Sequence, residues 1–554
     1  MIRISQIKMP VTGKEASLAE KAAGLLHIEK QEILSYRIIK KSVDARKKPA
    51  LFFIYTIDVE GRDEERILRR LSNRDRSSQR KGGVGIQIGR AEEKTWHFPE
   101  VTAPRDALRP VIIGTGPAGL FCGLLLAKHG FEPILLERGK AVEERKKDVE
   151  AFWKSGILKP DSNVQFGEGG AGAFSDGKLN TLVKDKEGRN REALKILVQA
   201  GAPEEILYEA KPHIGTDILM RVVRSMREEM LRFGAEIRFE SKVTDLVIEN
   251  GSIRGVVIND AELLKTDTVV LAIGHSARDT FQMLYENGIP MAAKPFAVGL
   301  RVEHPALMIN ETQYGMAESP HLQAASYKVT AQTKSGRGVY SFCMCPGGYV
   351  VNASSEEGRL AVNGMSYSGR DGKNSNSAVI VTVTPEDYES GHPLSGIAFQ
   401  RKLEEKAYGI GQGNIPVECY GDFREAVTKE APEFSMLLKK YPDFAPACKG
   451  GFRFASFHEI LPEALNRALV EVMEKFDRKM PGFADSGVYV SGIESRTSSP
   501  VRIHRDETGQ SAIRGLYPCG EGAGYAGGIT SAAMDGMLTA EKIAMRSAAA
   551  ETKS

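Results

Sequence analysis

A glycine-rich turn between two apolar segments constrains the fold of this chain more than any other feature. The apolar run at residues 111–113 leads into Gly114-Thr115-Gly116-Pro117-Ala118-Gly119, then into a helical stretch to residue 130 and a second apolar strand at 131–138. A lone G-x-G-x-x-G pattern is a weak signal, but its position between a buried strand and a helix makes it specific. The sequence therefore predicts a βαβ unit of an α/β domain.

Each glycine of the turn has a separate physical reason to be there. Gly114 allows the tight turn, Gly116 lets the backbone approach a pyrophosphate, and Gly119 permits close packing of helix on strand. Pro117 and Ala118 open the helix, whose free amides and dipole favour a negatively charged group. The turn is thus predicted to bind the diphosphate of a nucleotide.

An acidic residue at the end of the second strand narrows the type of nucleotide. Glu137 lies 18 residues beyond Gly119 and is followed by Arg138, which we include in the predicted site. A carboxylate there can accept the hydroxyl protons of an adenosine ribose and would repel a 2′-phosphate. An adenosine diphosphate group is therefore expected, and NADP is disfavoured. A purely structural tight turn is the alternative.

The C-terminal segment RGLYPCGEGAGYAGGITSAAMDGMLTA resembles the terminal motif of the glutathione-reductase-like flavoproteins. A strand at 516–519 is followed by Gly520-Glu521 and by a glycine-rich loop that opens a helix near Gly528. The resemblance implies FAD, with Glu521 on the ribityl chain where the family usually has aspartate. It also implies that the helix start, Gly528, Ile529 and Thr530, faces the flavin and stabilises its reduced anion.

Two further segments are expected beside the cofactor. The stretch TVVLAIGHSARD (268–279) resembles the middle motif of the same superfamily, where Ala272 and Gly274 would pass close to FAD, and Val243 would contact adenine. The loop GEGGAGAFSDGKLNT (167–181) also matches G-x-G-x-x-G, but no buried strand precedes it and no helix follows it. It is expected to cross the cofactor with residues 175–178, Ser175, Asp176, Gly177 and Lys178, a flexible surface loop being the alternative.

These segments, with the blocks SFCMCPGGYV, GMSYSGRDGKNS, GGFRFASFHEILP and GIESRTSSPVRI, resemble a bacterial family of uncharacterised FAD-dependent dehydrogenases over essentially the whole chain. The resemblance implies a Rossmann-like FAD-binding domain of the three-layer β/β/α type, at 106–289 plus 485–554. An α+β substrate domain would be inserted at 290–484. The implied activity is hydride transfer between flavin and an organic substrate, whose identity a fold does not supply.

The N-terminal 105 residues form a separate electrostatic unit. They carry 22 lysines and arginines against 14 acidic residues, a net charge of +8 in a chain whose total is +3. Apolar and charged segments alternate in a β-α-β-β-α order, which predicts a ferredoxin-like α+β domain. Residues 73–83 are expected to form a basic loop, and residues 101–110 a linker.

Two absences bear on the source of electrons. No C-x-x-x-x-C follows the first βαβ unit, and no second dinucleotide unit is evident for a resident nicotinamide. NAD(P)H or a protein donor is therefore expected to act only transiently. Candidate catalytic residues, for each of which a structural role is the alternative, are His275, Cys345, His458, Arg496 and Arg502. No His/Cys cluster has zinc spacing, so no metal is predicted.

Composition favours a cytoplasmic protein with no membrane partner. The start lacks an apolar leader, no run approaches a membrane span, and six cysteines in 554 residues form no disulfide framework. Two alternatives to an oxidoreductase stay open. One is an RNA-associated flavoprotein using the basic N-terminal domain, although it lacks an aromatic RNA-binding signature and nucleic acid is not the favoured partner. The other is a flavin sensor without catalysis.

Overall fold

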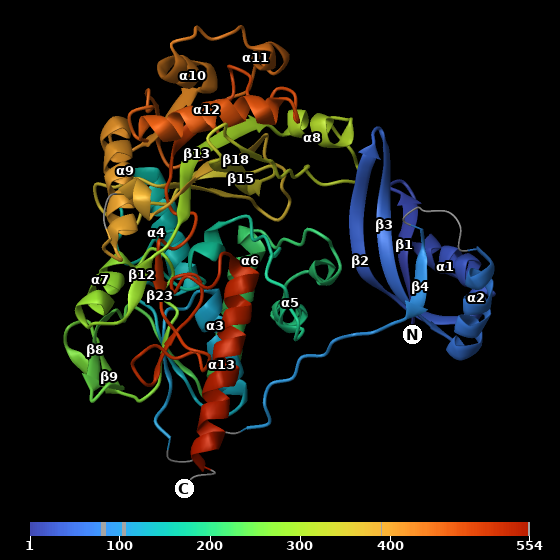
Figure 1. The fold of residues 1–554 in the computed structure, drawn as a ribbon, viewed down its shortest axis with the longest axis horizontal. Coiled ribbons are helices and arrows are strands. Elements are labelled where there is room, and N and C mark those ends of the chain that lie inside the picture. Colours follow the sequence, from blue (N-terminus) through green and yellow to red (C-terminus); the bar gives the residue numbers. More distant parts are fainter. Residues whose placement is uncertain (79–84, 102, 104–106, 389–390, 552–554) are drawn as a thin grey trace.

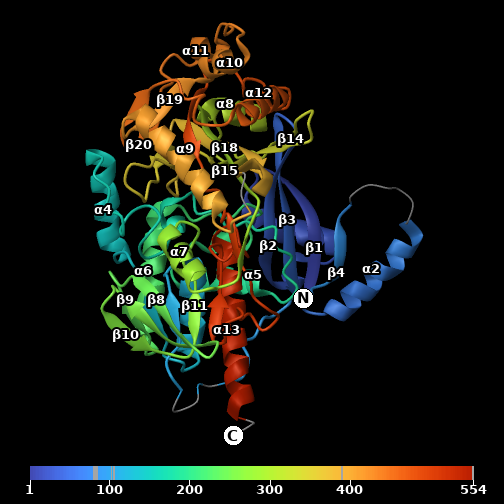
Figure 2. The ribbon, with the colours of Figure 1, turned by 60° about the vertical axis from the view of Figure 1, so that its left-hand side comes forward.

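The computed structural model describes the chain apart from residues 79–84, 102, 104–106, 389–390 and 552–554. Three groups of sheets succeed one another, and Figures 1 and 2 show their arrangement. The N-terminal group stands to one side of the other two, which are stacked. Over the described parts of the chain, no helix is both long and apolar enough to cross a bilayer.

The N-terminal group is a four-stranded sheet with the order β2-β3-β1-β4 and antiparallel neighbours throughout. Its elements are β1 (Ile2–Pro10), α1 (Leu18–Leu26), β2 (Ile33–Lys47), β3 (Ala50–Gly61), α2 (Glu64–Ser78) and β4 (Gln87–Arg90). Alternating residues of β1 and β3, such as Ile4 and Ile57, are buried against α1. Helix α2 continues to Ser78 instead of giving way to the expected loop at residue 73, and residues 79–83 of that prediction lie outside the described residues.

The second group is a parallel sheet with the order β24-β11-β5-β6-β7. Its short strands are β5 (Val111–Ile113), β6 (Ile134–Leu136), β7 (Glu236–Arg238), β11 (Val269–Leu271) and β24 (Leu516–Pro518). Apart from β7 at the edge, these strands are nearly continuously apolar because they are buried on both faces. The carboxyl ends of β5, β6, β11 and β24, which are strands from distant parts of the chain, therefore share one edge.

Layers cover both faces of the parallel sheet. Ile112, at the centre of β5, packs in a core formed with helices, whereas its neighbours Val111 and Ile113 pack against a second sheet. The helices in and around this group are α3 (Pro117–Lys128), α4 (Val142–Ser155), α5 (Arg189–Gln199), α6 (Thr216–Arg232), α7 (Arg278–Glu286) and α13 (Ile529–Glu551). The second sheet is β8 (Val243–Glu249), β9 (Ser252–Ile258) and β10 (Glu262–Lys265). Figure 1 shows α3 and α13 side by side.

The third group is built on a seven-stranded sheet with the order β14-β15-β18-β13-β22-β19-β21. Its strands are β13 (Phe296–Pro305), β14 (Thr330–Gln332), β15 (Gly338–Cys345), β18 (Asn374–Val383), β19 (Ile415–Cys419), β21 (Phe452–Phe454) and β22 (Tyr489–Glu494). Its helices are α8 (Ala306–Tyr314), α9 (Ser395–Gly411), α10 (Tyr420–Thr428), α11 (Met436–Lys440) and α12 (Glu463–Asp477). Small sheets complete it: β16 (Tyr349–Asn352), β17 (Val362–Met365) and β20 (Cys448–Lys449), with β12 (Met291–Ala293) on β23 (Val501–Ile503).

Strand β22 lies beyond residue 484, where the substrate domain was expected to end. It pairs antiparallel with β13 and with β19, so residues up to Glu494 belong to the seven-stranded sheet. The apolar run of β22 resembles any buried strand, and sequence alone gives no indication of which sheet it joins. The chain returns to the parallel sheet only after this strand, and the crossing segment lies beside the cavity described next.

Candidate active site

One cavity lies at the carboxyl-end edge of the parallel sheet, under the seven-stranded sheet. Most residues expected to bind the nucleotide line it. They are Gly114, Gly116, Pro117, Ala118, Glu137, Arg138, Ser175, Asp176, Gly177, Lys178, Val243, Ala272, Gly274, Glu521, Gly528 and Ile529. An edge where parallel strands end is the usual binding position in open α/β sheets.

Three of the expected residues support the cavity wall instead of lining it. A β-carbon on Gly119 would lie 1.9 Å from the Gly114 carbonyl oxygen, so this glycine lets α3 pack against the turn. The Gly520 amide donates to Asp535 at 2.7 Å. The Thr530 hydroxyl donates to the Leu179 carbonyl at 2.8 Å, which ties the start of α13 to the loop before residue 181.

The glycine turn requires its glycines for different reasons. Gly114 has a φ of +99°, and a β-carbon on it would lie 2.5 Å from the Ala272 carbonyl oxygen. Gly116 has ordinary backbone angles, and its nearest atom would be the Gly170 α-carbon at 3.9 Å. Glycine at 116 therefore leaves space in the cavity, whereas glycine at 114 is required by its positive φ and by the close approach of the Ala272 carbonyl.

The Glu137 carboxylate, which was expected to bind a ribose, already accepts several hydrogen bonds from the protein. One carboxylate oxygen accepts from the Thr115 amide at 2.9 Å and the Thr115 hydroxyl at 2.8 Å. The other accepts from the amides of Gly139 and Gly167, both at 3.0 Å. A carboxylate has about four acceptor positions, so a ribose hydroxyl would have to share them. Glu137 thereby fastens the loop at Gly167 to the nucleotide turn.

Arg145, which sequence reasoning missed, holds the same loop from behind. Its fully buried guanidinium donates to five backbone carbonyls between residues 163 and 170, at 2.7 to 3.1 Å. Burial lowers its pKa to about 10, so it remains charged at neutral pH. The loop is therefore fixed against the turn, and the glycine at 167 leaves room for Arg145, because a β-carbon there would overlap the arginine side chain. An arginine in an amphipathic helix gives no sequence signal of this role.

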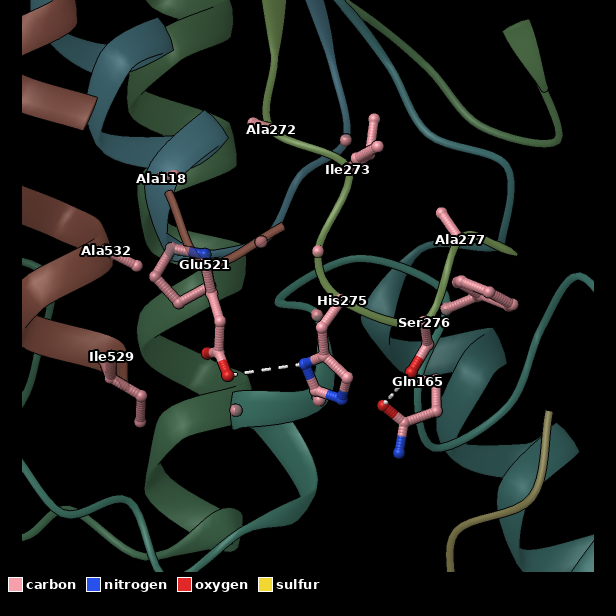
Figure 3. A pocket seen from close by; sticks show the side chains of 18 of the residues that line it. Ala118, Gln165, Ala272, Ile273, His275, Ser276, Ala277, Glu521, Ile529 and Ala532 are labelled. Carbon is pink, nitrogen blue, oxygen red and sulfur yellow. Dashed lines mark hydrogen bonds and ion pairs between the residues drawn. The ribbon is translucent and has the colours of Figure 1, made fainter. Parts of the chain in front are cut away.

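The expected candidate His275 lies beside Glu521 in the cavity (Figure 3). The histidine Nδ1 is 3.4 Å from a Glu521 carboxylate oxygen. The other ring nitrogen, Nε2, is buried and has no hydrogen-bond partner among the described residues. The two residues follow the adjacent strands β11 and β24, which explains why they meet. A histidine oriented by a carboxylate, with its second nitrogen free, can transfer a proton to a bound molecule.

Arg496 also borders the cavity, but its donors are already engaged. It binds both Glu404 carboxylate oxygens, at 2.9 and 2.8 Å, and the Ser355 hydroxyl at 2.5 Å. Arg278 shares the same carboxylate, at 2.8 Å to each oxygen. The charges of these two arginines outweigh burial and hold the pKa of Glu404 well below its usual range. This buried network braces α7 against α9, which leaves Arg496 little capacity to bind an anion in the cavity.

Three other expected candidates do not line the cavity. His458 lies beyond β21, where Nδ1 contacts the Ser456 hydroxyl at 3.1 Å. Arg502 donates to the Gly524 carbonyl at 2.8 Å and stacks on a tyrosine ring. Cys345 is fully buried, and its neighbour Cys343 borders the cavity instead. Among the described residues there is also no group of three side chains suited to a metal ion.

Two family models match the chain. Residues 295–497 match the family described as "FAD-dependent protein, C-terminal domain-like", and residues 1–60 match a domain of unknown function. An uncharacterised protein of Clostridium beijerinckii is 45% identical over 547 residues, which is 98% of each chain. The chain belongs to the family of this clostridial protein. The segment that matches the C-terminal domain family, residues 295–497, includes the seven-stranded sheet and its strand β22.

Solved structures resemble the chain only distantly. A flavin-dependent brominase is 12% identical with a TM-score of 0.35, covering 80% of each chain. The quinol fumarate reductase of E. coli is 14% identical with a TM-score of 0.35, covering 80% of this chain and 70% of that one. Likeness at this level carries no argument about the site.

In this family member, the cavity lies between two units. The segment at 295–497 contributes Phe342, Cys343, Asn363, Glu494, Arg496 and Thr497 to the lining. The parallel-sheet unit contributes the glycine turn, the loop at 167–178 and the His275–Glu521 pair. A molecule in the cavity would therefore contact both units at once.

Proposed function

We propose that this protein is an FAD-dependent oxidoreductase that transfers a hydride between flavin and a small organic substrate. The observation that carries the proposal is the convergence of the Gly114–Gly119 turn, the ends of β11 and β24 and the start of α13 on one cavity. These segments are the ones whose sequences resemble the FAD-binding motifs. The FAD-dependent C-terminal domain matched at 295–497 supports the same cofactor.

The cavity wall fits a long cofactor. β-Carbons on Gly274, Gly527 and Gly528 would have no atom within 4 Å, so these lining glycines leave open space where side chains would protrude. The lining also extends from Val243 on β8 to Cys343 on β15. This extent supports a dinucleotide over FMN, because both an adenosine end and a flavin end find residues of the expected kind.

Each part of the wall would have its own task. The first amides of α3 would donate to the pyrophosphate, and the start of α13 would favour negative charge on the reduced ring. When bound, FAD would supply the hydride transfer itself. Nε2 of His275 would hold or release a proton for the substrate, while Glu521 orients the ring through Nδ1. Burial under the C-terminal domain would exclude water.

No observation favours an RNA-associated role over this one. Several arginines of the basic N-terminal domain are paired with acids of the same domain, including Arg3 with Asp58 at 2.7 Å and Arg66 with Glu32 at 2.6 Å. Such pairing reduces the free positive field on which nucleic-acid binding depends. The side chains of the basic run after residue 73 lie outside the described residues.

The test is the identity of the cofactor. Protein purified under native conditions, or reconstituted after removal of any bound cofactor, should show a flavin spectrum and release FAD rather than FMN on denaturation. Chromatography of the released material with mass detection distinguishes the two. Protein that takes up neither flavin would refute the proposal, and uptake of FMN alone would refute the role of the glycine turn.

A further inference from the structure

The end of strand β15 carries two cysteines on an irregular piece of backbone. Phe342 pairs with Ala378 on β18 and Cys345 pairs with Asn376, so β15 has one residue more than its partner over this stretch. Cys343 lies in this bulge with a φ of +41°, in the left-handed region that few non-glycine residues adopt. Bulges of this kind redirect side chains and are frequent beside active sites.

The bulge gives the two sulfurs different surroundings but keeps them together. Cys343 borders the cavity, whereas Cys345 is fully buried behind it. The Cys345 thiol donates to the Cys343 carbonyl oxygen at 3.2 Å, which keeps the two cysteines side by side.

A buried cation lies against both cysteines. The Arg301 guanidinium contacts the Cys345 sulfur at 3.4 Å and the Cys343 carbonyl at 2.5 Å, and it pairs with Glu494 at 3.0 Å. The hydrogen bond from Cys345, aided by the charges of Arg301 and Lys178, outweighs burial and lowers the pKa of Cys343 to about 5. Burial raises the pKa of Cys345. Cys343 is therefore the more acidic of the two thiols.

No other cysteine among the described residues combines a position at the cavity with a lowered pKa. Burial raises the pKa of Cys122 and Cys519, which pack within the helical core of the parallel-sheet unit. Burial also raises the pKa of Cys419 and Cys448, which do not line the cavity. A thiolate bordering the cavity with a protonated thiol beside it is the arrangement of an attacking and a resolving cysteine.

We propose that Cys343 and Cys345 form a redox-active dithiol that exchanges electrons with the flavin, so that the substrate is a small thiol or disulfide. This inference rests on the proposed function. In one direction, the Cys343 thiolate and the Cys345 thiol together lose two electrons and form a sulfur–sulfur bond. Bound FAD would supply the two-electron acceptor, and the electron pair and the proton of Cys345 would pass to it, so charge and hydrogen balance. A disulfide substrate would be reduced by exchange at Cys343, which the cavity exposes.

The first test measures alkylation of each cysteine by iodoacetamide in the full-length protein, using peptide mass spectrometry. The rate at Cys343 should change less than about twofold between about pH 6 and 8, because its thiolate is already formed. The rates at Cys419 and Cys448 should rise about tenfold per pH unit, as for any thiol below its pKa. Replacing Cys345→Ala should make Cys343 pH-dependent, whereas Cys345→Ser, which keeps a hydrogen-bond donor, should largely preserve the flat profile.

The second test measures the disulfide itself. In a buffer of oxidised and reduced dithiothreitol, the tryptic peptide of residues 338–359 should lose two hydrogens in the wild-type protein and in neither Cys345 variant. Anaerobic reductive titration of oxidised, FAD-loaded protein should consume about twice as many electrons in the wild type as in Cys345→Ser. Cys343 that alkylates with the pH dependence of Cys419, or a peptide that stays reduced throughout, would overturn the inference.

The two proposals fail separately. FAD uptake is measured on the same preparations, and the alkylation profile needs no flavin. Protein that binds FAD while its cysteines stay reduced contradicts only the dithiol. Protein that binds no flavin contradicts the proposed function, and the dithiol as a partner of flavin with it.

Discussion

Replacing Gly116 and Gly119 by alanine should separate cofactor binding from folding. The nearest atom to a β-carbon on Gly116 would lie 3.9 Å away, so the methyl group fits the protein itself and projects into the cavity. A β-carbon on Gly119 would lie 1.9 Å from the Gly114 carbonyl oxygen, which cannot move without disrupting the turn. We therefore expect Gly116→Ala to weaken FAD binding with little loss of stability, and Gly119→Ala to destabilise the fold.

The magnitudes follow from these contacts. A methyl group in the pyrophosphate position should cost about 1–3 kcal/mol, as overpacking does, or about 5- to 150-fold in the dissociation constant. Gly116→Ala should change the free energy of unfolding by less than about 0.5 kcal/mol. Alanine is a poorer N-cap residue than glycine, but it also lowers the entropy of the unfolded chain, and the two effects oppose each other. For Gly119→Ala, the overlap is with backbone atoms, so the overpacking cost should lie near the upper end of about 1–3 kcal/mol and exceed the gain in helix propensity of about 1 kcal/mol.

Fluorescence titration with FAD measures the binding, and urea denaturation of the cofactor-free protein measures the stability. Gly409→Ala is a control, because a β-carbon on this helix glycine would have no atom within 4 Å and Gly409 lies outside the cavity. The Gly409→Ala protein should bind FAD with the affinity of the wild type. If Gly116→Ala binds FAD as the wild type does, the turn does not hold the pyrophosphate and the reasoning is wrong.

Other predictions follow from the site and its surroundings. Arg145→Leu should lower the free energy of unfolding by about 3–5 kcal/mol and increase proteolysis at residues 163–170, since five carbonyls lose their donor; unchanged cleavage would contradict its role. Burial raises the pKa of Glu418 to about 7, above the unfolded value of about 4.3, so the folded state binds the extra proton and stability falls as pH rises from about 4 to 7. Glu418→Gln should reduce the slope of that part of the stability curve measured by urea denaturation, to which Glu168 and Glu494, whose pKa values burial also raises to about 7, contribute as well. Stopped-flow absorbance should show only slow anaerobic reduction of the flavin by NADH or NADPH alone, whereas fast saturable reduction would reveal a nicotinamide site.

The parts of the fold with local sequence patterns could be predicted. The glycine turn, the end of β11 and the start of α13 each combine a short apolar strand with glycines that have a specific task, and all three border one cavity. The turn at Asn250-Gly251, a dipeptide typical of hairpins, likewise joins β8 to β9, with positive φ at both residues.

Contacts between distant segments could not be predicted. His275 and Glu521 were separate candidates for different roles, and they meet only because β11 and β24 are neighbours in the sheet. Arg145 reaches its carbonyls from the opposite side of a loop, and nothing in its own helix indicates this. The bulge in β15 reversed the expectation for the cysteines, since it places Cys343 and not Cys345 at the cavity.

A crystal structure of the protein with FAD tests the central claim most directly. We predict the pyrophosphate at the amides following Gly116, the adenosine end near Val243, and the isoalloxazine ring beside His275 and the start of α13. Density for FAD in the reverse orientation, or at any site other than this cavity, would contradict the account.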